Sequence, residues 1–115
     1  MTYEDWKRHI INVTRAISDE EYQRRTWFGA DSEISSPDEM ICNVFDDYLL
    51  PEFIREHRHR LTESELLSAE RFLAAMEQFA DSTPKHLDPD TVFRDERWQR
   101  IRTLAREMLV AWSGS

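Results

Sequence analysis

The residues best suited to metal chemistry in this sequence are a histidine pair beside a glutamate and two adjacent aspartates. The segment 56–59 has the Glu-x-x-His spacing, which on a helix sets a carboxylate beside an imidazole, as in di-iron bundles. Such a site needs a second motif, and neither His9 nor His86 follows a glutamate by three residues. Asp46 and Asp47 could ligate Mg²⁺, but no phosphate-binding loop accompanies them. We therefore expect no metal and no other cofactor.

Nucleophilic catalysis finds equally little support. The sequence contains no Gly-x-Ser-x-Gly elbow, and its single cysteine, Cys42, has no cationic sequence neighbour that would lower the thiol pKa. Cys42 also borders an apolar helical face, so we interpret it as a packing residue. An enzymatic alternative is a polar interior site around Arg97, for which snorkelling or an ion pair is the simpler interpretation. We expect a protein that is not an enzyme.

Length and composition favour one all-α domain spanning residues 1–115. The chain is 40% apolar and 11% aromatic, enough for a hydrophobic core, while two glycines and four prolines provide too few turns for an all-β fold. One cysteine allows no internal disulfide, the N-terminus shows no apolar signal region, and the longest apolar run is five residues. These features predict a cytoplasmic protein that does not enter membranes.

Capping signals and apolar spacing predict a bundle of four main helices with one or two short helical segments. The first helix begins after Thr2, and Ser18 with Glu21 then signals a short helix that ends near Gly29. The other main helices begin at Ser36, at Thr62 and after Asp88. The helix that begins at Ser36 should continue to residue 49, before Pro51. The last carries an apolar stripe expected in the core: Trp98, Ile101, Ala105, Met108 and Trp112.

The net charge of −8 is concentrated in one stretch of the chain. Residues 31–56 contain eight acids and one base, a balance of −7, and the rest of the chain carries only −1. On the predicted helix starting at Ser36, the polar side has no Lys or Arg three or four residues from its acids, so the usual compensating pairs are missing. An uncompensated acidic surface repels nucleic acid and favours a basic protein partner. The candidate contact residues are Trp27, Phe28, Asp31, Glu33, Glu39, Asn43, Asp46, Asp47 and Glu52.

Two alternatives remain open at this stage. Arginines of the last helices could cover the acidic surface without any partner: Arg94, Arg97, Arg100 or Arg102. Trp27 and Phe28 could close the end of the core instead of serving as exposed aromatic anchors.

In overall character the chain resembles the small, acidic, all-helical immunity proteins that neutralise bacterial toxins, including those of contact-dependent inhibition and colicin-type systems. The residues that carry the resemblance are Asp31, Glu33, Glu39, Asp46, Asp47 and Glu52. The resemblance implies tight, non-catalytic, one-to-one binding that blocks a toxin, with a basic nuclease domain as a partner that fits the charge. Other hypotheses are a regulatory or adaptor protein, a homo-oligomer that uses an apolar helix surface, and a small helical enzyme.

Overall fold

The computed structural model describes residues 2–29, 32–83 and 87–113, and in these ranges the chain is helical with no strand. Three long helices form the frame: α1 (Tyr3–Ser18), α5 (Glu63–Ser82) and α7 (Glu96–Trp112). Shorter helices complete it: α2 (Glu20–Trp27), α3 (Pro37–Cys42), the π-helical turn η1 (Asn43–Asp47), α4 (Leu50–His57), the 3₁₀ turn η2 (Arg58–Arg60) and α6 (Pro89–Arg94). The predicted all-α bundle is confirmed.

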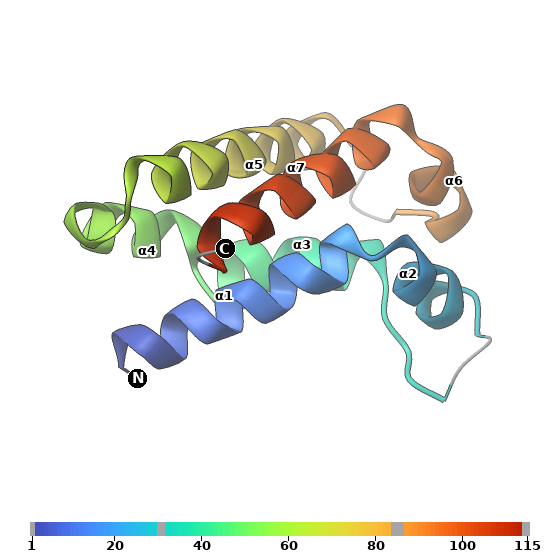
Figure 1. Cartoon of the computed structure of the whole chain (residues 1–115). Coiled ribbons are helices and arrows are strands. Elements are labelled where there is room, and N and C mark those ends of the chain that lie inside the picture. The colour runs from blue at the N-terminus through green and yellow to red at the C-terminus, as the bar shows by residue number, and fades with distance from the viewer. Residues whose placement is uncertain (1, 30–31, 84–86, 114–115) are drawn as a thin grey trace.

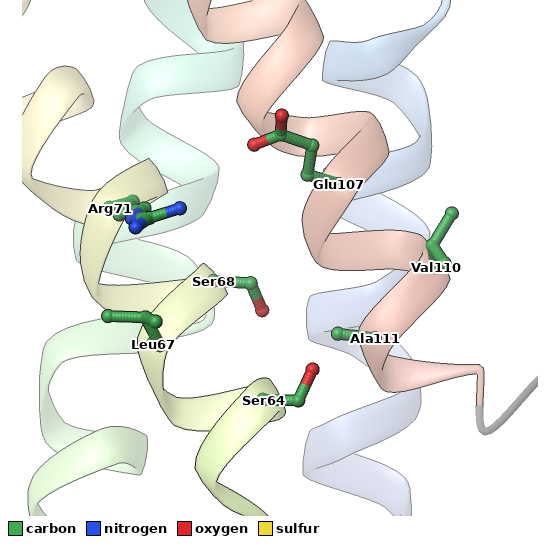
Figure 2. Close-up of a pocket in the computed structure, with 7 residues that line it drawn as sticks. All are labelled: Ser64, Leu67, Ser68, Arg71, Glu107, Val110 and Ala111. Carbon is green, nitrogen blue, oxygen red and sulfur yellow. The ribbon is translucent and has the colours of Figure 1, made fainter.

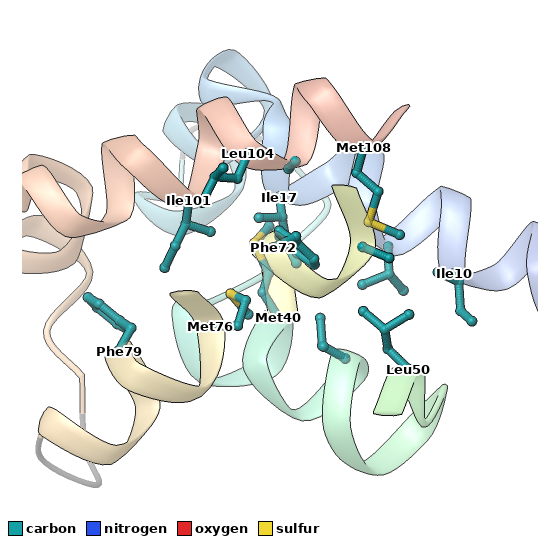
Figure 3. Packing of buried hydrophobic residues seen from close by; sticks show 14 of the residues in the cluster. Ile10, Ile17, Met40, Leu50, Phe72, Met76, Phe79, Ile101, Leu104 and Met108 are labelled. Carbon is teal, nitrogen blue, oxygen red and sulfur yellow. The ribbon is translucent and has the colours of Figure 1, made fainter. Parts of the chain in front are cut away.

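The core forms where α7 packs against both α1 and α5, and α5 lies antiparallel beside α7 (Figure 1). Figure 3 shows side chains of these three helices converging with those of α3 and α4. Trp98, Phe53, Phe72 and Met76 have no exposed surface, and the whole predicted stripe of α7 is buried. A continuous apolar core of this kind provides the main driving force for folding.

Local capping explains most helix boundaries. Thr62 and Glu65 form the predicted reciprocal capping box at the start of α5, and the side chain of Ser36 accepts the Glu39 N–H at the start of α3. Asp19, one residue later than Ser18, caps α2. Gly29 has a φ of 73°, the left-handed conformation expected of the residue that follows a helix.

The helix predicted from Pro37 to residue 49 is divided. It is α-helical only to Cys42 and then widens into η1, where the Tyr48 N–H donates to the Asn43 carbonyl, five residues back, at 2.9 Å. Leu49 follows with a φ of 51°, a left-handed conformation that is uncommon outside glycine, asparagine and aspartate. The chain therefore turns sharply into α4, and this break positions the acidic residues of η1.

Candidate interaction surface

The acidic stretch is held on the bundle by a buried apolar side. Met40, Val44 and Leu50 are each only 2% exposed and anchor α3, η1 and α4 in the core. At the end of η1, the indole N–H of Trp6 donates to the backbone carbonyl of Tyr48 at 2.6 Å. The outer side of this segment is therefore presented by a fixed scaffold.

Four acidic side chains lie on the exposed side of the segment and its preceding loop. They define the acidic surface, which consists of Glu33, Glu39, Asp46 and Asp47. Asn43, also a predicted contact residue, is partly exposed between Glu39 and Asp46 along the chain. Glu52, at the first turn of α4, is partly buried, and its Oε2 atom is enclosed without a hydrogen-bond partner. Glu52 is consequently less available to a partner than the other four carboxylates.

Three of the four arginines that could have covered the acidic surface form ion pairs elsewhere. Arg94 pairs with Asp90, and Arg97 pairs with Asp95. The guanidinium of Arg102 lies in the core region, where its Nη1 atom is 3.2 Å from Glu20. Arg100 lines a hollow beside Gln78 and Phe79 of α5.

Among the described residues, no Lys or Arg nitrogen lies within 4.0 Å of a carboxylate of the acidic surface. The carboxylates of Glu39, Asp46 and Asp47 therefore have no ion pair within the described chain. Like charges held close together without a counter-charge raise the free energy of the unbound protein. A cationic partner would relieve this repulsion.

One end of the acidic surface is oriented by a tyrosine. The hydroxyl of Tyr22 on α2 donates to Glu33 Oε1 at 3.0 Å. Partial burial, then Glu33 and then Glu39, raises the pKa of Tyr22 above its ordinary value. The tyrosine therefore remains a neutral donor at neutral pH and holds Glu33 near the start of α3.

Cys42 differs from its prediction. The residue is exposed and unpaired rather than packed. Its thiol lies among three carboxylates: partial desolvation and then Asp46, Asp47 and Asp38 raise the thiol pKa above its ordinary value. The raised pKa keeps the sulfur protonated at neutral pH, which disfavours nucleophilic chemistry. Cys42 lies between Glu39 and Asp46 along the chain and therefore provides a chemical handle inside the acidic surface.

The two aromatic candidates have different environments. Trp27 is 7% exposed and packs against Trp98, with ring centroids 5.7 Å apart, so we remove it from the predicted contact residues and assign it to the core. The ring is buried because α2 turns it toward α7. Phe28 is 45% exposed and meets Phe93 edge-to-face, which leaves part of its ring available. Asp31, also a predicted contact residue, lies outside the described residues.

Two apolar residues near the acidic surface were not among the contact residues predicted from the sequence. Ile34, next to Glu33, is 79% exposed, and Leu49, two residues after Asp47, is 38% exposed. With Phe28, they are three of the large exposed apolar side chains of the described residues, and all three fall in or next to the acidic stretch. Exposed apolar residues bordered by charge are typical of protein-binding surfaces. The sequence signal that could have identified Ile34 is its position as a large apolar residue in the otherwise polar stretch from residue 31 to residue 36.

The other chemical candidates behave as structural residues. His57 contacts the rings of Tyr3, Trp6 and Phe53, with centroid separations of 4.9, 5.6 and 5.0 Å, and so belongs to an aromatic cluster. Within the described ranges, no group of three or more His, Cys, Asp and Glu side chains is arranged to hold a metal ion. None of the described helices combines the length and the apolar character needed to cross a bilayer.

Comparison of this chain with protein-family models, with curated proteins and with solved structures finds no match.

Proposed function

We propose that this chain is a non-catalytic binding protein that acts in the bacterial cytoplasm as a toxin immunity protein. The observation that carries the proposal is the acidic surface, in which Glu39, Asp46 and Asp47 are exposed on a fixed scaffold without an ion pair to another described residue. A basic toxin domain, such as a nuclease, has the complementary charge.

The mechanism is electrostatic steering followed by local packing. The acidic surface accelerates the encounter with a basic partner, because complementary potentials raise association rates above those of neutral pairs. Phe28, Ile34 and Leu49 then supply apolar contacts that slow dissociation. The bound chain prevents the substrate from approaching the toxin, and no covalent chemistry is required.

A protein partner is favoured over a nucleic acid by the sign of the charge. Binding to phosphate backbones depends on cationic side chains, whereas this stretch of the chain presents carboxylates. A nucleophilic role for Cys42 is disfavoured because its exposed thiol has a raised pKa and lies beside acids rather than beside a base.

The first experiment uses the genomic neighbourhood. The C-terminal domain of a large secreted protein encoded directly upstream would be co-expressed with this chain and purified through a tag on that domain. We expect a stable one-to-one complex and survival of cells that otherwise die from the domain. If the two proteins separate on purification and the cells die, that protein is not the partner and the immunity role loses its main support.

The native cysteine then tests where the partner binds. Cys42 is the only cysteine of the chain, so a bulky maleimide reports on the acidic surface without any mutation. In the complex we expect labelling of Cys42 to slow at least tenfold relative to the free chain. Unchanged labelling in a complex that remains intact would place the interface elsewhere.

A further inference from the structure

A second surface lies on the outer side of α5 and α7, where the two helices leave a hollow of about 390 Å³. Figure 2 shows Ser64, Ser68 and Arg71 extending from α5 toward α7, with Glu107 extending back from α7. Two apolar side chains flank the hollow: Leu67 is 48% exposed and Val110 is 63% exposed. The serines and Ala111 are small, so a second helix could approach closely.

Two long-range contacts define the antiparallel register of α5 and α7. Trp112 Nε1 donates to the Glu65 carbonyl at 2.9 Å near one end. Arg97 Nη1 donates to Ser82 Oγ at 2.8 Å near the other end. Residues between these contacts therefore lie approximately level in pairs. Four such pairs in which both residues are exposed are Leu67 with Val110, Arg71 with Glu107, Ala74 with Thr103, and Gln78 with Arg100.

Each of these four pairs is chemically complementary. The pairs match an apolar residue with an apolar one, a cation with an anion, a small residue with a small one, and an amide with a guanidinium. Arg71 and Glu107 are both exposed and line the same hollow, yet neither has an ion pair or hydrogen bond with another described residue. Their charges are therefore available to a partner.

We propose that this α5/α7 surface binds a second copy of the chain. A two-fold axis lying in the interface and parallel to both helices stacks α5 of each copy on α7 of the other. Every level pair then meets its own complement across the axis. Leu67 faces Val110 of the second copy, and Arg71 faces Glu107 of the second copy, each twice in the dimer.

Charge and area define what kind of dimer to expect. The chain as a whole is strongly acidic, and this net charge disfavours self-association. Within the α5/α7 surface, however, the positive charge of Arg71 offsets the negative charge of Glu107. Helix dimensions give the face about 500 Å² per copy, or about 1,000 Å² in total, at the low end of specific interfaces. A reversible dimer with a micromolar to millimolar dissociation constant follows.

The test is a charge-swap series followed by sedimentation velocity from micromolar to millimolar protein. The unmodified chain should show a concentration-dependent dimer. Arg71→Glu and Glu107→Arg should each weaken the dimer at least tenfold, because each places like charges together at two symmetric positions. The double variant restores opposite charges at both positions and should recover dimerisation.

Glu4→Arg on α1 serves as the control for the charge change and should leave the dimer unaffected. A chain that stays monomeric over the whole range overturns the proposal, and so does a double variant no better than the singles. Melting curves check that every variant is folded. Asp46→Lys with Asp47→Lys should leave the dimer intact, so this result is independent of toxin binding.

Discussion

Arg102 of α7 and Gln23 of α2 form a buried hydrogen bond, with Nε 2.8 Å from Oε1, at exposed fractions of 2% and 0%. The same Gln23 oxygen accepts from the indole of Trp98 at 3.1 Å, and the Gln23 amide donates to the carbonyls of Ala16 and Ile17 on α1. One amide therefore joins three helices. This network fixes α2, and with it Tyr22, which orients the acidic surface.

Replacing this amide should be among the most destabilising single changes in the chain. Gln23→Leu leaves the guanidinium of Arg102 and the indole N–H of Trp98 without their buried acceptor, so we expect a loss of about 3–5 kcal/mol in the free energy of unfolding. Gln23→Leu with Arg102→Met should recover part of that loss, because both polar partners are then replaced by apolar groups. Urea unfolding of the four proteins of this cycle measures the coupling, and a loss below about 1 kcal/mol for Gln23→Leu would contradict the account.

A second prediction concerns the left-handed residue after η1. Leu49 has a φ of 51°, so Leu49→Gly should relieve backbone strain and leave stability unchanged or raise it by up to about 1 kcal/mol. Leu49→Val should lower stability, because a β-branched side chain tolerates this conformation poorly. Thermal unfolding measures the stability of both variants against the unmodified chain. Equal losses for both variants would mean that packing of the side chain, and not the backbone, dominates at this position.

A third prediction is a pH dependence at Glu65. Burial alone would raise the pKa of this carboxyl, but the Thr62 backbone N–H and the Lys7 ammonium, 2.9 Å from Oε2, outweigh it and lower the pKa below its ordinary value. The resulting stability is complete above the pKa of the unfolded state, about 4.3, and is lost as the pH falls through the lower folded-state value. Glu65→Gln retains an acceptor for the helix cap but removes the charge.

At neutral pH we expect Glu65→Gln to lower the free energy of unfolding by about 1 kcal/mol. The difference between the two proteins should shrink below about pH 4.3 and disappear in stronger acid. Urea titrations of both proteins at a series of pH values measure this difference in the free energy of unfolding. A difference that stays constant down to low pH would assign the effect to packing rather than to ionisation.

A fourth prediction separates binding from stability at Ile34. Because its side chain is 79% exposed, Ile34→Ser should change the free energy of unfolding by no more than about 0.5 kcal/mol. Affinity for the toxin domain should fall at least about tenfold if this residue is an apolar anchor. Val110→Ser, at 63% exposure on α7, is the matched control and should leave toxin affinity unchanged. Equal affinities for the two variants would remove Ile34 from the interface.

The sequence predicts the long helices well because their signals are local. The capping box of Thr62 and Glu65 and the apolar stripe from Trp98 to Trp112 depend on residues within a few turns of one another, and both are confirmed. The division of the helix after Cys42 has no comparable local signal, since Asn43 to Asp47 are compatible with an α-helix. There the buried anchors on both sides and the Trp6–Tyr48 hydrogen bond are tertiary contacts that override the local preference.

The same distinction applies to the surface. The excess of acidic residues is visible in the sequence. Whether basic side chains neutralise these acids depends on where the folded chain places arginines that are distant in the sequence. Arg102, one of the candidates to cover the acids, lies in the core, where its Nε–H donates a hydrogen bond to Oε1 of Gln23, 79 positions away. Cys42, predicted to pack, is exposed, and Trp27, for which a core role and a contact role were both open, is buried. Helical phase alone does not say which neighbour covers a face.

The most direct test of the central claim is protection of cells from the toxin domain by charge-reversed variants. Asp46→Lys with Asp47→Lys reverses two carboxylates of the acidic surface, and Glu77→Lys with Asp81→Lys makes the same change in net charge on α5. We predict that the first pair lowers affinity at least about 100-fold and abolishes protection, while the second retains both. Full protection by the Asp46→Lys, Asp47→Lys variant at normal expression, or equal loss by both pairs, would contradict the account.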